Sequence, residues 1–144
     1  APDIISTDDQ TQIPNPFTEC DTLEEAEALA GFSISVPASI DGYTQNYITA
    51  IPDEMIHVSY ENGDEEMYFR KGTLTDDLSG DYNVYAYEAT ISLDGLNITV
   101  KGDADQQLHV AFWSDEEHSY AIGSSAALDA DTMAEYIRTL AELS

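Results

Sequence analysis

Basic side chains are nearly absent from this sequence. It has 4 Lys and Arg residues (Arg70, Lys71, Lys101 and Arg138) against 29 Asp and Glu, which gives a formal net charge of −25 at pH 7. A nucleic-acid-binding protein needs clustered cations to displace counterions from phosphates, and an anionic membrane surface repels so acidic a chain. The sequence therefore predicts no nucleic-acid partner and no direct binding to an anionic membrane. A cationic partner, metal ions, an uncharged ligand or a purely solubilising role remain open.

Cysteine is almost as scarce as the basic residues. Cys20 is the single cysteine, so an internal disulfide is excluded. It lies in the acidic stretch FTECDTLEE, where neighbouring carboxylates raise the pKa of a thiol, whereas a nucleophilic cysteine needs a lowered pKa. We therefore expect Cys20 to have no catalytic role.

Long apolar runs are also missing. No stretch approaches the roughly 20 residues that a membrane-spanning helix needs. The start APDIISTDD has no charged-then-apolar leader and is typical of a mature or trimmed end, which is compatible with a leader or anchor removed upstream.

Catalytic motifs do not stand out. His57, His109 and His118 are isolated on separate predicted strands, unlike the paired histidines of helical metallohydrolase motifs. We expect solvent-facing strand histidines, with a convergent three-histidine site as the less favoured alternative. The stretch GSSA at 123–126 lacks the G-x-S-x-G frame of a serine nucleophile. Carboxylate pairs suited to glycoside hydrolysis arise by chance in so acidic a chain, so the sequence predicts a protein that is not an enzyme.

The composition and length fit one folded domain. The chain has 144 residues and is 42% hydrophobic, enough for a core without disulfides. Residues 1–16 combine prolines and polar residues without an apolar period, which predicts a flexible lead-in. Residues 17–144 then form a single domain.

Periodicity indicates helices at both ends of this domain. In DTLEEAEALAG, Thr22 and Glu25 have capping-box spacing and Gly31 is a typical C-terminal stop. The final stretch LDADTMAEYIRTLAELS predicts a helix with Asp129 as N-cap and Leu128 and Met133 as a hydrophobic staple. Its apolar stripe consists of Met133, Tyr136, Ile137 and Leu140.

Between the predicted helices, apolar residues recur at every second position, a period that is typical of strands. FSISV at 32–36 is predicted as a strand that Pro37 ends, and in MIHVSYE the side chains of Met55, His57 and Ser59 share one face. Asn62-Gly63 and Asp94-Gly95 predict tight hairpins. The predicted fold is α+β, an antiparallel β-meander of about six to seven strands with the N- and C-terminal helices packed on one face.

The stretch RKGTLTDDLSGDYNVYAY at 70–87 has the most concentrated chemistry. Its alternating oxygen ligands resemble a calcium loop in spacing, but the sixth position is Tyr82 where a sharp turn needs glycine. We therefore reject a helix–loop–helix calcium site and retain a looser surface calcium site as an alternative, with Asp76, Asp77 and Asp81 as its candidate ligands. The favoured interpretation is a charge cluster that holds the loop, made of Arg70, Lys71, Asp76, Asp77 and Asp81.

Three tyrosines in the same stretch, Tyr82, Tyr85 and Tyr87, favour a strand. The alternation predicts that Tyr85 and Tyr87 share a face. A place in the core under the helices is favoured over an exposed platform for a carbohydrate or peptide.

Several stretches together resemble the bacterial domain-of-unknown-function family numbered 4367. They are NPFTECDTLEEAEALAGFSISVP, YITAIPDEMIHVSYENG, FRKGTLTDDLSGDYNVY, ITVKGD and VAFWSDEEHSYAI. The resemblance covers roughly residues 15 to 143 and implies a short helix, a β-meander and a terminal helix. It also implies a secreted or membrane-anchored protein of a Gram-positive-type bacterium. The family has no established catalytic residues, so the resemblance assigns none here.

These observations predict a non-enzymatic extracytoplasmic domain without a cofactor, with protein interaction in a sensory or regulatory ectodomain as its task. The alternative is a small-ligand or calcium-binding module that uses the acidic loop at 76–81. A hydrolase based on two carboxylates is a third, less favoured class.

Overall fold

A computed structural model describes most of the chain. The described residues are 18–37, 39–40, 42–75, 78 and 85–141. The predicted lead-in at 1–16 lies outside them, as do Asp76, Asp77, Asp81 and Tyr82. The elements are β1 (Thr18–Cys20), α1 (Leu23–Ala30), β2 (Ser39–Ile40), β3 (Tyr43–Ile51), β4 (Met55–Asn62), β5 (Glu65–Thr73), β6 (Tyr87–Leu93), β7 (Leu96–Ala104), β8 (Gln107–Ser114), β9 (His118–Leu128) and α2 (Ala130–Ala141).

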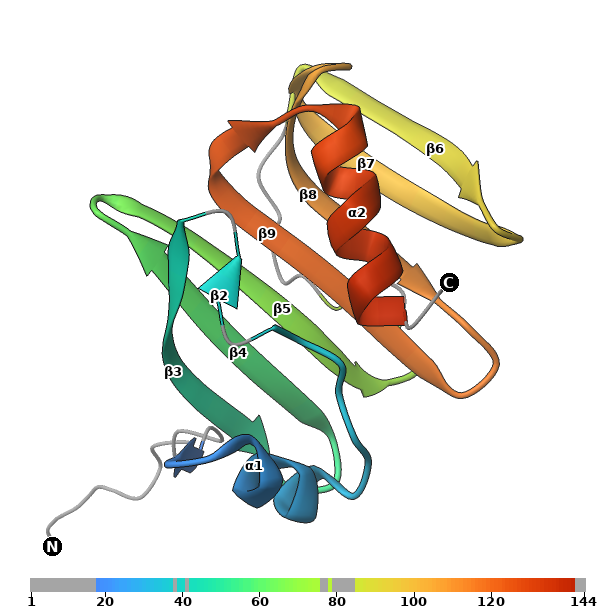
Figure 1. The fold of residues 1–144 in the computed structure, drawn as a ribbon. Helices are drawn as coiled ribbons and strands as arrows, with labels where there is room; N and C mark the ends of the chain where they lie inside the picture. Colours follow the sequence, from blue (N-terminus) through green and yellow to red (C-terminus); the bar gives the residue numbers. More distant parts are fainter. Residues whose placement is uncertain (1–17, 38, 41, 76–77, 79–84, 142–144) are drawn as a thin grey trace, which may run out of the picture.

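All nine strands of the described chain belong to one antiparallel sheet (Figure 1). Its order is β1-β3-β4-β5-β9-β8-β7-β6, with β2 paired to β3 beside this path. Two meanders, β3 to β5 and β6 to β9, are thus joined where the last strand β9 pairs with β5. The predicted α+β class, with an antiparallel sheet and a helix at each end, is confirmed. The sheet has more strands than predicted because the two short strands β1 and β2 pair with β3.

Both helices pack on the same face of the sheet and create the hydrophobic core there. The predicted stripe of α2 is buried in full, and α1 buries Ala26 and Ala30. The sheet contributes Ile56, Val58 and Phe69, each 0% exposed. We call this the helix face, and the opposite side of the sheet the open face.

The predicted helix caps are confirmed. Thr22 Oγ1 accepts a hydrogen bond from the Glu25 amide at 3.1 Å, and Glu25 Oε1 accepts one from the Asp21 amide at 2.8 Å. Gly31 ends α1 with a φ of 90°, a left-handed conformation that favours glycine. Asp129 Oδ1 accepts from the Thr132 amide at 2.7 Å, which satisfies a free donor of the first turn of α2.

Both predicted hairpins are present. Asn62 pairs with Glu65, so the first turn consists of Gly63 and Asp64, one residue later than the predicted Asn62-Gly63. Leu93 pairs with Leu96, and Asp94 and Gly95 between them have φ values of 51° and 89°. Two consecutive positive φ angles are typical of the turn that matches the twist of a hairpin.

The predicted strand at 32–36 is wrong. This segment crosses the helix face without a ladder partner among the described residues, because side chains take the hydrogen bonds that a neighbouring strand would supply. The Ile34 amide donates to Glu27 Oε2 of α1, and Lys71 Nζ of β5 donates to the Ser33 carbonyl at 2.8 Å. Tyr60 Oη of β4 donates to the Pro37 carbonyl.

Candidate functional site

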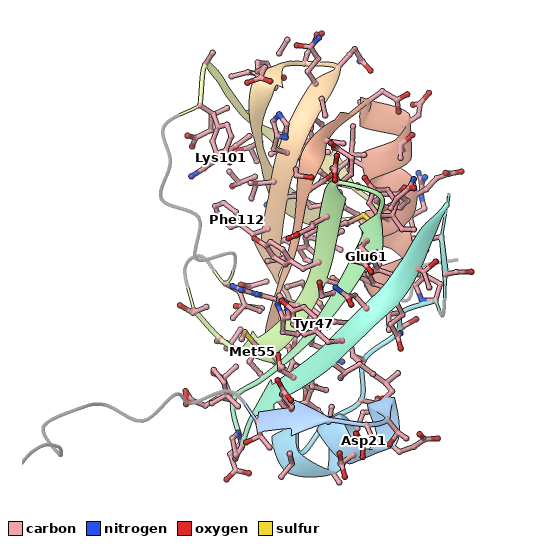
Figure 2. All side chains as sticks on the ribbon, turned by 90° about the vertical axis from the view of Figure 1, so that its left-hand side faces the viewer. Asp21, Tyr47, Met55, Glu61, Lys101 and Phe112 are labelled. Atoms are coloured by element: carbon pink, nitrogen blue, oxygen red, sulfur yellow. The ribbon has the colours of Figure 1, made fainter. Side chains whose placement is uncertain are left out.

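The open face of the sheet carries large aromatic side chains, and neither α1 nor α2 covers it. Strand pairing places Phe112 of β8 and Arg70 of β5 on this side through their shared partner Ala121 of β9. Figure 2 shows Phe112 and Lys101 on the side of the sheet away from α2. Aromatic rings at the surface of a sheet are a common feature of binding surfaces.

A cavity of about 420 Å³ opens on this face. Its aromatic lining comes from Tyr47, His57, Tyr68, Tyr85 and His109. Polar side chains complete it, namely Ser59, Ser124, Ser125, Glu66 and Asp103. We call this cavity the open-face pocket. Its size and its mixture of aromatic walls and a few polar groups are typical of ligand sites.

The pocket is hollow because large and very small side chains alternate along one cross-strand row. Tyr47 pairs with Ser59, Ser59 with Tyr68, and Tyr68 with Gly123. Facing side chains of neighbouring strands normally fill the space between them, but the small side chain of Ser59 leaves it open, and Gly123 lets the Tyr68 ring lie down against β9. The ring of Tyr68 lies over Gly123, where a Cβ atom would come within 2.2 Å of the ring.

His57 lies at the floor of the pocket between two tyrosine rings. Its ring centroid is 5.7 Å from that of Tyr47 and 5.4 Å from that of Tyr68. Its Nδ1 atom accepts a hydrogen bond from Arg70 Nε at 2.9 Å. Burial, and secondly the Arg70 charge, lower the pKa of His57 to about 4. The expected solvent-facing histidine is therefore wrong at this position, because the tyrosines leave His57 only 8% exposed.

His109 lies on the other side of the pocket and has a different environment. The register of β8 against β9 shifts between Leu108 and Val110, an irregularity that redirects the side chain between them. His109 Nδ1 is 3.0 Å from the Ser124 carbonyl and Nε2 is 3.1 Å from Asp103 Oδ2. Both partners accept hydrogen bonds, so His109 can donate to both only when each of its ring nitrogens carries a proton. The Tyr85 ring stacks on His109 with centroids 6.1 Å apart.

The third histidine does not join the other two. His118 packs against Phe32, with ring centroids 4.7 Å apart, away from the pocket. Within the part of the chain that the structure describes, no three His, Cys, Asp or Glu side chains are arranged to hold a metal ion. The alternative of a three-histidine site is therefore not supported.

Arg70 and Lys71 of the predicted charge cluster lie on opposite faces of β5, as neighbouring strand residues do. Arg70 Nη1 donates to the Leu78 carbonyl at 3.2 Å on the open face. Lys71 is 7% exposed on the helix face, 5.7 Å from the ring of Phe32 and 5.6 Å from that of Tyr120. The three aspartates lie outside the described residues, so the cluster and the calcium alternative stay predictions. Lys71 contacts the Ser33 carbonyl and the rings of Phe32 and Tyr120, on the face opposite Arg70.

The predicted common face of Tyr85 and Tyr87 is wrong. Tyr87 begins β6 and packs against the core, whereas Tyr85 precedes the strand and lines the open-face pocket. The alternation of strand side chains therefore does not extend back to Tyr85.

The pKa of the Cys20 thiol is raised, as its acidic neighbours in the sequence predict. Burial, followed by the charges of Glu25 and Asp21, raises the pKa of its thiol. Such a thiol is a poor nucleophile near neutral pH.

Among the described residues, no helix is long and apolar enough to cross a membrane.

We expect His57 to make the folded protein less stable in mild acid. Because the pKa of His57 is lowered to about 4, against about 6.5 in the unfolded chain, the unfolded state binds the extra proton between these values. Stability contributed by the neutral ring is present above about pH 6.5 and is lost as the pH falls towards 4. The loss should be about 2 to 3 kcal/mol.

The measurement is urea unfolding of the wild type and of His57→Asn at intervals from pH 7.5 to 4.5. Asparagine keeps an acceptor near Nδ1 and does not titrate, while the carboxylates contribute equally to both proteins. The wild type should lose more stability over this range than the variant. Parallel stability profiles would contradict the buried, neutral state of His57.

Comparison with known proteins gives no relative of this chain. No family model, no curated protein and no solved structure matches it. The resemblance to the family numbered 4367 therefore stays a prediction, and function is to be argued from the open-face pocket.

Proposed function

We propose that this protein is a non-enzymatic extracytoplasmic interaction domain that holds part of a protein partner in the open-face pocket. The observation that carries this proposal is the row Tyr47, Ser59, Tyr68 and Gly123, which makes a concave aromatic site on the face opposite α1 and α2. The extracytoplasmic location depends on the family resemblance, and the interaction depends on the pocket.

The construction of the pocket favours binding with little rearrangement. Three of the four residues in the row belong to the adjacent strands β3, β4 and β5, and Gly123 belongs to β9, which pairs with β5. Side chains on paired strands are held more precisely than side chains on loops, so less entropy is lost when a partner binds. Tyrosine suits this role since its rigid ring offers both a large apolar surface and a hydroxyl group.

The charge of the chain favours a partner with positive potential. A net charge of −25 attracts cationic surfaces at long range and repels anionic ones. Tyr47 is 50% exposed. Its ring gives such a partner an aromatic contact at the edge of the pocket.

The proposal is tested with Gly123→Ala, a variant that changes the shape of the pocket without changing charge. The added methyl group must displace the Tyr68 ring, because the contact of 2.2 Å is far below the van der Waals distance. Binding of basic, acidic and neutral peptides and of a neutral oligosaccharide is measured by titration calorimetry. At least one probe should bind the wild type, and Gly123→Ala should bind it at least 10-fold more weakly.

Gly31→Asn is the matched control, since Gly31 lies at the end of α1 and nothing lies within 4 Å of a Cβ atom there. It should bind like the wild type. Circular dichroism is used to verify that both variants are folded. Equal binding by Gly123→Ala and the wild type, or no binding of any probe, would refute the pocket as the interaction site.

A further inference from the structure

We propose that the open-face pocket receives the cationic end of an arginine or lysine side chain from a basic segment of the partner. This inference rests on the proposed function and adds the chemical class of the group that enters the pocket. Three observations carry it: the aromatic walls, the carboxylates among them, and the way in which this chain places its own cations.

The walls of the pocket are tyrosine rings from three separate parts of the chain. Tyr47 lies on β3, Tyr68 on β5, and Tyr85 precedes β6. Histidine rings pack against them, with His57 beside Tyr47 and Tyr68, and His109 against Tyr85. Aromatic faces carry partial negative charge and attract a cation that lies within about 6 Å of the ring centre.

The protein already uses its aromatic rings in this way. Three of the four basic side chains lie over rings: Arg70 at 4.5 Å from the centre of Tyr68, Lys71 at 5.6 Å from that of Tyr120, and Lys101 at 5.5 Å from that of Phe112. The fourth, Arg138, is 3.7 Å from an Asp94 carboxylate oxygen. A ring of the pocket, Tyr68, thus holds a guanidinium group beside the proposed site.

The pocket offers carboxylates to a cation, and two positive groups lie beside them: doubly protonated His109 against Asp103, and Arg70 over the Tyr68 ring. Glu66 and Asp103 both line it, and its described lining contains no lysine or arginine. The side chain of Asp103 is 64% exposed and contacts His109 through one oxygen at 3.1 Å. Burial and the Arg70 charge keep the pKa of His57 at about 4, so this ring adds no positive charge near neutral pH. A guanidinium or ammonium group therefore meets aromatic faces and carboxylates together.

The test compares two peptides that differ in charge and hardly in shape. One has arginines spaced by Gly and Ser, and the other has citrulline at the same positions, with a neutral urea group in place of the guanidinium. At 0.15 M NaCl the arginine peptide should bind the wild type at least 10-fold more tightly than the citrulline peptide. Tyr47→Leu and Tyr85→Leu should each weaken its binding about 3-fold or more, whereas Tyr47→Phe, which keeps the ring, should retain it.

A second set of variants separates a local site from general attraction to an acidic protein. Glu66→Gln with Asp103→Asn removes two charges at the pocket, and Glu24→Gln with Glu135→Gln removes two exposed charges on α1 and α2. The first pair should weaken binding of the arginine peptide about 5-fold or more, and the second less than 2-fold. Equal effects of the two pairs would overturn the proposal, since diffuse charge would then account for the binding.

The outcomes also separate this inference from the proposed function. If the citrulline peptide or a neutral oligosaccharide binds as tightly as the arginine peptide, and Gly123→Ala abolishes that binding, the pocket is an interaction site but not a cation site. If Gly123→Ala leaves the binding of every probe unchanged, both proposals fail.

Discussion

Phe69→Ala should lower the free energy of unfolding by about 3 to 5 kcal/mol, the range for removing a fully buried phenylalanine. Phe69 is 0% exposed on β5, and its ring centroid lies 5.5 Å from that of Tyr60 and 5.9 Å from that of Tyr136 on α2. Its loss leaves a cavity between the sheet and the helix that covers it. Urea unfolding at pH 7 measures the change.

Phe112→Ala is the matched control, because it removes the same side chain from β8 on the open face. Phe112 is half-buried, and its ring lies beside Lys101 without a helix above it. The cost should be about 1 to 2 kcal/mol, in line with the smaller apolar area lost. Equal costs for the two variants would contradict the division of the sheet into a core face and an open face.

Gly102→Ala should destabilise the protein by about 3 kcal/mol or more, because the new methyl group meets the backbone. A Cβ atom at Gly102 would lie 2.1 Å from the Gln107 carbonyl oxygen and 2.6 Å from Leu108 Cα. Here β7 and β8 approach each other closely where their register shifts on both sides of Gly102. The strands have to separate to admit the methyl group. The variant should also disturb His109, which follows Leu108 on β8.

Urea unfolding and amide hydrogen exchange measure this effect, with faster exchange expected in β7 and β8. Gly31→Asn serves as the control, since asparagine tolerates the left-handed conformation there and should cost less than about 1 kcal/mol. A loss below 1 kcal/mol for Gly102→Ala would show that β7 and β8 are not held as described.

The features that the sequence predicts correctly are local. The capping residues Thr22 and Asp129 and the turn at Asp94-Gly95 act on neighbours within a few positions, so their chemistry can be read directly from the chain. The common face of His57 and Ser59 is also confirmed, because it follows from the period of a single strand.

The open-face pocket could not be predicted in the same way, because it depends on which strands pair. Tyr47, Ser59, Tyr68 and Gly123 become a row through three pairings, of which β5 with β9 joins segments about 50 residues apart. In the sequence, Gly123 appears only as part of an incomplete serine motif, although it is the position on which the Tyr68 ring lies.

The strand predicted at 32–36 failed for a related reason. The apolar residues of this segment do pack on the sheet, as Ile34 at 5% exposure shows. Its backbone, however, finds partners in the side chains of Glu27 and Lys71. Hydrogen bonds from distant side chains compete with a strand ladder and leave no periodic signal in the sequence.

Binding at the open-face pocket can be tested by mapping amide chemical-shift changes when the arginine peptide is added to the ¹⁵N-labelled protein. The pocket predicts changes centred on Tyr47, Ser59, Tyr68 and Ser124, with the amides of α2 unmoved. Changes centred on either helix, or small changes spread evenly over the acidic surface, would contradict binding at the open face.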